Sequence, residues 1–275
     1  IGVGILNSIQ SVEVGKFINI GTSTLGAYGD KNGNGKVDGA VGVYTEEATR
    51  PVKGRVYTYT TDANGVTTET ITAGGKDDHG LENTIGIEDT SQPYTDSTGA
   101  TKYKRTGKQV GTDTVEVGGT VTLGENSASS FGLRNKASGS ITLVSGGKVV
   151  VEGEKNYGAL SNGSAYQRQV KKAANAYYTG VSEVAKIDIN YGATINVTGK
   201  KSIGYAMLSG QGTNSGEITV TGNNTPVPGS TNYEGSLGFY GENGTFNNES
   251  TGKITTSGDL AHAVVVKNPG MTFEH

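Results

Sequence analysis

The run Asp30-Lys-Asn-Gly-Asn-Gly-Lys-Val-Asp38 has the residue types and spacing best suited to hold a metal ion. Oxygen-bearing side chains fall at alternate positions, as in calcium loops, and a glycine permits the sharp turn. The ligands would be Asp30, Asn32, Asn34, the carbonyl of Lys36, and Asp38. Val41 stands where an EF-hand has its bidentate glutamate, so the site would be weak. The alternative is a turn between strands that needs no metal.

Residues that would support catalysis are sparse. The histidines, His79, His262 and His275, do not have metal-ligand spacing, and the chain has no cysteine and no G-x-S-x-G motif. Glu46-Glu47 and Asp77-Asp78 are adjacent pairs, and neighbours on a strand point to opposite faces. We therefore expect a protein that is not an enzyme.

A polar stretch from Thr45 to Lys108 contains the residues best suited to contact a partner: Tyr57, Tyr59, Tyr94, Tyr103, Lys104 and Arg105. Tyrosine gives a large, stiff and amphipathic contact surface. Residues 56–60 and 66–72 are β-prone and flank Asp62-Ala-Asn-Gly65, which predicts a β-hairpin. So long an insertion is rarely without a function, and we expect a projecting arm. The alternative is a solvated decoration that shields the side of the molecule.

The composition indicates how these residues are positioned. The 275 residues include 45 glycines but only 5 prolines, and only 33% are hydrophobic, so a thick globular core is not expected. Short runs of Val, Ile and Thr recur between turn residues, as in strands. The net charge of -3 argues against binding to nucleic acid, which favours basic surfaces. No stretch approaches the ~20 apolar residues of a membrane helix.

One pattern recurs along the chain: apolar-x-apolar, a glycine, polar residues, then Gly or Ala beside an aromatic or aliphatic residue. A repeat of roughly 20 to 30 residues is typical of a solenoid, whose stacked rungs form a narrow continuous core. We therefore predict an all-β, right-handed parallel β-helix, and a β-sandwich is the alternative. The paired segments are Ile18–Ile20 with Gly26–Tyr28, Val121–Leu123 with Phe131–Leu133, Val149–Val151 with Tyr157–Ala159, Ile195–Val197 with Ile203–Tyr205, Ile218–Val220 with Leu237–Phe239, and Ile254–Thr256 with Leu260–Val264; Ile141–Leu143 is an extra copy.

A second insertion spans Ser164 to Val184. Its apolar residues fall three or four apart, which predicts a short amphipathic helix. We expect this helix to pack on the solenoid; the alternative is that its basic side binds a membrane or a partner. The predicted organisation is rungs at 1–44, an inserted arm at 45–108, rungs at 109–163, the helical insertion at 164–184, and rungs at 185–275.

Three segments, Gly192–Met207, Asn214–Asn223 and Gly244–Thr255, resemble the passenger repeats of large fusobacterial autotransporter adhesins. The resemblance implies a type V (type Va) secreted passenger at the bacterial cell surface, attached to the outer membrane through a C-terminal barrel that is absent here. It also implies attachment to host cells or coaggregation with other bacteria. The two insertions do not share the resemblance.

The leading hypothesis is an adhesin segment whose insertions bind a host cell-surface receptor or glycan, or surface proteins of other bacteria. The alternatives are a structural stalk section with no binding site of its own, and a β-helical carbohydrate-active enzyme. Exposed end rungs are open strand edges, so self-association is a further expectation.

Overall fold

The computed structural model describes the chain in ranges separated by gaps. They are residues 3–5, 11–14, 17–20, 35–45, 48–51, 56–72, 86, 88–105, 108–111, 114–136, 139–163, 166–173, 176–183, 185–224 and 235–275. Every described element is a β-strand, and no helix occurs in these ranges. Accordingly, the described residues include no helix long and apolar enough to cross a membrane.

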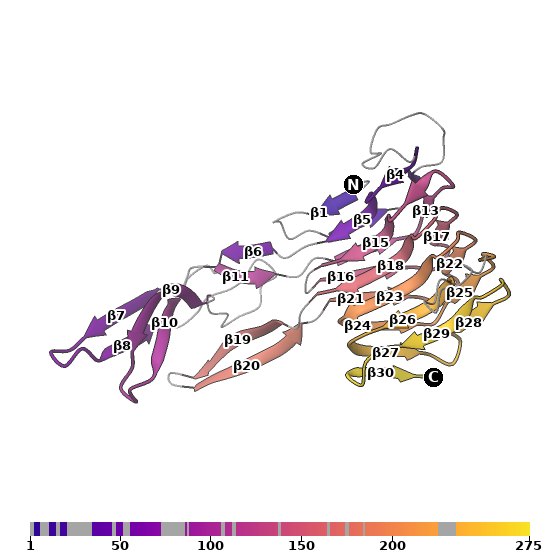
Figure 1. The fold of residues 1–275 in the computed structure, drawn as a ribbon. Helices are drawn as coiled ribbons and strands as arrows, with labels where there is room; N and C mark the ends of the chain where they lie inside the picture. The colour runs from indigo at the N-terminus through magenta and orange to yellow at the C-terminus, as the bar shows by residue number, and fades with distance from the viewer. Residues whose placement is uncertain are drawn as a thin grey trace.

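Three parallel sheets form the body of the molecule, a β-solenoid (Figure 1). Sheet A contains β1 (Val3–Ile5), β5 (Val41–Thr45), β15 (Phe131–Asn135), β18 (Tyr157–Asn162), β23 (Ile203–Ser209), β26 (Leu237–Gly241) and β29 (His262–Val266). Sheet B contains β2 (Ser11–Val14), β12 (Thr114–Val117), β16 (Ser140–Leu143), β21 (Lys186–Ile189), β24 (Gln211–Asn214), β27 (Gly244–Asn248) and β30 (Met271–Glu274). Sheet C contains β3 (Phe17–Ile20), β13 (Thr120–Leu123), β17 (Lys148–Val151), β22 (Thr194–Val197), β25 (Glu217–Val220) and β28 (Lys253–Thr256).

Each rung passes through sheet B, then sheet C, then sheet A, so the parallel solenoid predicted from the repeat is confirmed. The apolar-x-apolar segments form sheet C, where Val149 pairs with Val121 and with Ile195. Two details of the predicted repeat were wrong or incomplete. Ile141–Leu143 is not an extra copy but belongs to the third sheet, B. The sheet A segment after β3 is Val41–Thr45, whereas Gly26–Tyr28 lies outside the described residues.

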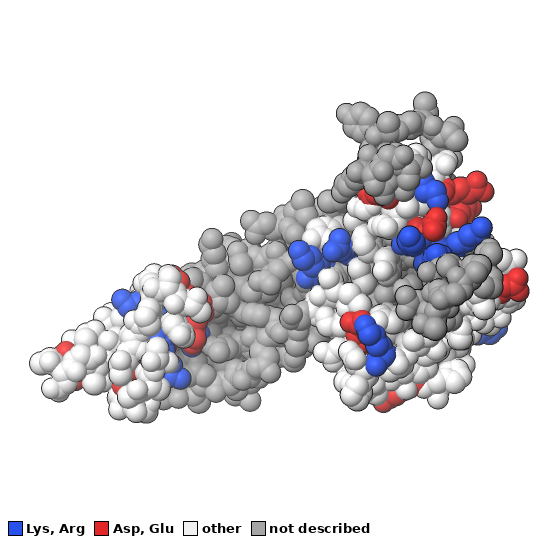
Figure 2. Space-filling model, viewed as in Figure 1, with Lys and Arg blue, Asp and Glu red and all other residues white. Residues whose placement is uncertain are grey.

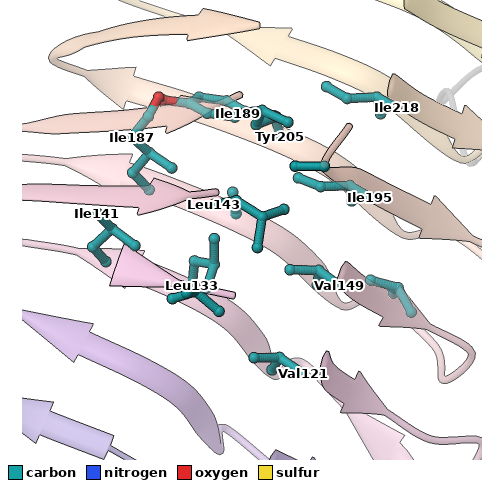
Figure 3. Close-up of a cluster of buried hydrophobic side chains, with 14 of the residues drawn as sticks. Val121, Leu133, Ile141, Leu143, Val149, Ile187, Ile189, Ile195, Tyr205 and Ile218 are labelled. Atoms are coloured by element: carbon teal, nitrogen blue, oxygen red, sulfur yellow. The ribbon is translucent and has the colours of Figure 1, made fainter. Parts of the chain in front are cut away.

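The core is a narrow column of side chains between the three sheets (Figure 3). In its middle rungs it is aliphatic, and Leu133, Ile141 and Ile195 are fully buried. Towards the C-terminal rungs it becomes aromatic. The ring of Phe246 lies 4.9 Å from that of Tyr205, 4.2 Å from that of Phe239 and 5.7 Å from that of Phe273, measured between centroids.

Gly212 makes room for the largest of these aromatic side chains. It pairs with Ile187 and Phe246 in sheet B, so a side chain there would enter the core. A Cβ built on Gly212 would lie 2.5 Å from the hydroxyl of Tyr205. That hydroxyl donates a hydrogen bond of 3.1 Å to the carbonyl of Ile187. The absence of a side chain at 212 therefore allows a tyrosine to cross the core and satisfy its polar end.

A buried polar ladder fixes the corner between sheets C and A. The side chains of Ser130, Asn156, Ser202 and Ser236 are fully buried. The Oδ1 atom of Asn156 accepts from the Ser130 N–H at 2.8 Å, and the Ser202 Oγ atom accepts from the Asn156 N–H at 3.1 Å. The Ser236 Oγ atom continues the ladder by accepting from the Ser202 N–H at 3.2 Å. In each rung, a side-chain oxygen thus accepts from a corner N–H group that would otherwise be buried without a hydrogen-bond partner.

The first insertion begins with β-strands, as predicted. The expected hairpin is formed by β7 (Tyr57–Thr61) and β8 (Thr67–Ile71), which pair antiparallel. At its turn, the Asp62 carboxylate accepts hydrogen bonds of 2.9 Å from the N–H groups of Asn64 and Val66. A second hairpin, β9 (Glu88–Thr95) with β10 (Thr101–Arg105), follows. Nearer the solenoid, β6 (Ala48–Pro51) pairs antiparallel with β11 (Lys108–Gly111).

The helix predicted within Ser164–Val184 was wrong. Residues 166–183 instead form an antiparallel pair, β19 (Tyr166–Ala173) and β20 (Ala176–Glu183). The register shifts twice, between Gln167 and Gln169 and between Lys171 and Ala173. An irregular register breaks strict alternation, so apolar spacings of three and four do not exclude strands. The β-favouring run Tyr177-Tyr178-Thr179 also agrees with a strand.

The two insertions leave the solenoid at the same corner. The first follows β5 and the second follows β18, so both occupy the connection from sheet A to sheet B. Figure 1 shows both projecting to the same side of the solenoid. Only β15 lies between β5 and β18 in sheet A, so the two points of departure are two strand spacings apart, ~10 Å.

Candidate functional site

The contact residues predicted in the first arm fall into two groups, of which one holds the arm together. The hydroxyl of Tyr59 donates to Glu69 Oε1 at 2.7 Å and accepts from the Arg105 N–H at 2.6 Å. The hydroxyl of Tyr57 accepts from the Gly86 N–H at 2.6 Å. The bond to Glu69 lies within the β7–β8 hairpin, and the bonds from Arg105 and Gly86 join this hairpin to β10 and to the segment before β9.

Arg105 completes this joint. Its Nη2 atom lies 3.3 Å from Glu88 Oε1, its Nε atom lies 3.4 Å from Glu69 Oε1, and Nη1 donates to the carbonyl of Gly86 at 3.2 Å. Burial raises the pKa of the Tyr59 hydroxyl well above its ordinary value. The Arg105 N–H opposes this shift and Glu69 adds to it. Tyr57, Tyr59 and Arg105 therefore act as internal supports of the arm.

Tyr94, Tyr103 and Lys104 form the second group. Each is half-buried on β9 or β10. The ring of Tyr94 packs on that of Tyr59 at 5.5 Å, and the Lys104 ammonium lies 5.4 Å from the same Tyr59 ring. All six predicted contact residues are half-buried, and these three are the ones whose side chains make no hydrogen bond within the described part of the chain.

An exposed threonine face, which was not predicted from the sequence, lies on the β7–β8 hairpin. Thr58 pairs with Thr70 and Thr60 pairs with Thr68, all four exposed. The alternation of threonine with tyrosine and glutamate in these strands was the available signal, because alternate residues share one face.

The predicted calcium ligands lie mostly outside the described residues, which exclude Asp30, Asn32 and Asn34. Asp38 lies in β4 (Val37–Asp38), which pairs with β14 (Ser127–Ala128). Its Oδ2 atom is buried without a hydrogen-bond partner among the described residues. The Lys36 Nζ atom lies 3.2 Å from Glu154 Oε2. The described ranges contain no group of three His, Cys, Asp or Glu residues placed to hold a metal ion.

The outward face of sheet A carries a groove that the sequence analysis also missed. Its floor is formed by in-register rows of apolar side chains, including Phe131, Tyr157, Ile203 and Leu237. The rings of Phe131 and Tyr157 stack at 5.2 Å. Two adjoining hollows of about 340 Å³ and 680 Å³ share Ile203 and Tyr240. Together they run across the strands from β15 to β29, along the solenoid axis.

Basic side chains flank this groove. Lys155 and Lys201 stand at its rim before β18 and β23, and Lys267 stands at the opposite rim after β29. Figure 2 shows basic groups, with acidic groups beside them, on both sides of a largely uncharged strip of the solenoid. His262 also lines the larger hollow, whose lining includes no carboxylate. Glu242 lines the smaller hollow and accepts from the Tyr240 hydroxyl at 2.6 Å and from Lys267 Nζ at 3.0 Å.

The positive charge of the lysine rim affects the pKa of Glu154. Burial would raise the pKa of this carboxyl. The hydrogen bond from Lys36 and the charges of Lys36, Lys155 and Lys201 outweigh burial and lower the pKa. The groove therefore combines an apolar floor with one cationic rim, formed by Lys155 and Lys201, in a chain whose net charge is -3.

No family model, curated protein or solved structure matches this chain. The geometry of the arms and of the groove is therefore what bears on function.

Proposed function

We propose that this chain is an adhesin segment of an autotransporter passenger, displayed at the bacterial cell surface, whose arms attach the bacterium to host cells or to other bacteria. The observation that carries the proposal is the departure of both β-stranded insertions from one corner of the solenoid. A long scaffold with projecting arms on one side suits contact between two surfaces. The resemblance of Gly192–Met207, Asn214–Asn223 and Gly244–Thr255 to adhesin passenger repeats supports the same class.

The packing of the scaffold supports a role in presentation. The rungs have a continuous core and a buried corner ladder, so the points from which the arms leave are held at a fixed separation. Within the first arm, the contacts of Tyr59 and Arg105 fix one hairpin on the other. A contact surface ordered before binding loses less conformational entropy when a partner binds.

We further propose that the solenoid is a right-handed β-helix. Successive strands of each sheet are parallel and are joined by connections through the other two sheets. Connections between parallel strands of one sheet are right-handed in the great majority of proteins, because strand twist favours that hand.

The test is to remove each arm while leaving its rung intact. Residues 136–139, Lys-Ala-Ser-Gly, connect β15 to β16 at the same corner without an arm. One variant replaces residues 46–113 by this tetrapeptide, and a second variant replaces residues 163–185. Binding to host cells and to partner bacteria is then compared with that of the intact chain.

We expect the intact chain to bind and at least one armless variant to lose binding, with the circular dichroism of the solenoid preserved. Full binding by a variant lacking both arms would contradict the role of the arms. An intact chain that binds no cell would instead favour a structural stalk section.

A further inference from the structure

We propose that the groove on the outer face of sheet A binds an extended anionic glycan, independently of the arms. The groove extends over β15, β18, β23, β26 and β29, which is four strand spacings or ~19 Å. This length accommodates several sugar rings in a row along the solenoid axis.

The floor of the groove suits the apolar faces of sugar rings. Phe131, Tyr157, Ile203 and Tyr240 line its hollows and are half-buried, so each presents part of its surface outward. Pyranose rings have faces made of C–H groups, which pack on aromatic and aliphatic side chains. Successive floor residues are one strand spacing apart, so the contacts repeat along the groove.

The rims supply the charge that selects an anionic chain. Lys155 and Lys201 occupy equivalent positions of adjacent rungs, each two residues before the paired residues Tyr157 and Ile203. Lys267 lies on the opposite rim. Carboxylate or sulfate groups on a chain between these rims would meet two lysines on one side and Lys267, paired with Glu242, on the other. Electrostatic complementarity with the lysine rim favours specificity.

The backbone of both rim lysines is in the left-handed region, with φ of 56° at Lys155 and 51° at Lys201. Gly39 occupies the equivalent position of an earlier rung, with φ of 65°. A non-glycine residue in this conformation costs ~1 kcal/mol. Lysine thus stands twice where glycine would be less strained, and Ser129 and Leu260 occupy the same position in two other rungs. Unlike serine and leucine, lysine at this corner adds positive charge to the groove.

A glycan fits this surface better than an acidic peptide does. Peptides that bind to sheets commonly add a strand to an open edge. The strands under the middle of the groove, β18, β23 and β26, are each paired on both sides. Their backbone groups are therefore already bonded within the sheet, and recognition relies on side chains alone.

Binding is measured with a uronic-acid oligosaccharide and with dextran sulfate as anionic probes, neutral dextran as the uncharged control, and oligoglutamate as the acidic peptide. The test variant combines Lys155→Gln with Lys201→Gln. The matched control combines Lys148→Gln with Lys253→Gln, which removes two exposed lysines from sheet C instead. A third variant, Tyr157→Ser, alters the floor without changing charge. Thermal unfolding verifies that each variant is folded.

We expect at least one anionic glycan to bind, more weakly as salt is added. The sheet A double variant should bind ~2- to 30-fold more weakly, as the loss of two exposed ion pairs implies. Tyr157→Ser should also weaken binding, whereas the sheet C control and the variant lacking both arms should bind like the intact chain.

The proposal is overturned if neither anionic glycan binds, if oligoglutamate binds equally well, or if the sheet C control weakens binding equally. Because the armless variant is tested separately for cell attachment, either proposal can fail without the other.

Discussion

The Cγ2 methyl of Ile195 occupies the space that a side chain at Gly158 would need. A Cβ built on Gly158 would lie 2.6 Å from this methyl and 2.6 Å from the carbonyl oxygen of Gly204. Gly158 lies in sheet A, and Ile195 lies in sheet C of the following rung. Gly132 faces Val149, and Gly204 faces Ile218, in the same way. A column of glycines in one sheet therefore receives a column of aliphatic side chains from another, and each contact joins successive rungs.

Gly158→Ala should lower the free energy of unfolding by ~1–3 kcal/mol, because the added methyl meets a backbone carbonyl that cannot move aside easily. Gly118→Ala is the matched control, since a Cβ there would lie at an ordinary 3.4 Å from Val144 Cγ2. Urea unfolding of the two variants measures the difference. Equal stability of the two variants would show that the column tolerates a methyl group.

Tyr59→Phe should loosen the first arm without affecting the solenoid. The substitution removes a donor to Glu69 and an acceptor of the Arg105 N–H, and a buried polar group left unpaired costs ~1–3 kcal/mol. Hydrogen exchange should become faster in residues 57–72 and 88–105 and remain unchanged in sheets A to C. Tyr103→Phe is the control, because the hydroxyl of Tyr103 makes no hydrogen bond among the described residues. If the hydrogen exchange rates of the arm are unchanged in the Tyr59 variant, this residue does not support the arm.

The stability of the solenoid should fall in alkali because of Tyr205. Burial, with a smaller effect from Asp188, raises the pKa of this hydroxyl well above 10.0. The folded state thus disfavours the phenolate, so this contribution is fully present below pH ~10 and is lost as the pH rises further. Tyr205→Phe should therefore lose less stability between pH 9 and pH 11 than the unaltered chain does. Parallel pH profiles in chemical unfolding would count against the assignment.

We propose that Asp30, Asn32, Asn34, the Lys36 carbonyl and Asp38 bind calcium weakly. The buried, unpaired Oδ2 atom of Asp38 supports a ligand at this position. Calorimetric titration of calcium into chelator-treated protein should give a Kd of ~10⁻⁴ to 10⁻³ M, as expected for a site with few carboxylates.

Asp38→Asn should abolish the calcium heat, and Asp259→Asn, an exposed control, should retain it. If calcium produces no heat with the unaltered chain, the calcium proposal fails and the alternative, a turn that needs no metal, is favoured.

The sequence by itself determined the strands of the solenoid and the hairpin of the first arm. The reason is that both signals are local. The alternation in Val149-Val150-Val151 puts two side chains on one face, and Asn64-Gly65 between β-prone runs specifies a tight turn. A local signal was misleading at 166–183, where irregular pairing produced apolar spacings that also suit a helix.

Only the tertiary structure decided which residues meet. Phe131, Tyr157 and Ile203 are 26 and 46 residues apart along the chain, and the register of sheet A makes them neighbours in one groove. The common corner of the two arms depends on the same stacking, because a rung has the same three corners whatever the length of the insertions. The support roles of Tyr59 and Arg105 could not be predicted from the sequence for a related reason. Whether a tyrosine faces a partner or a neighbouring hairpin depends on how the two hairpins pack, and no local pattern specifies that contact.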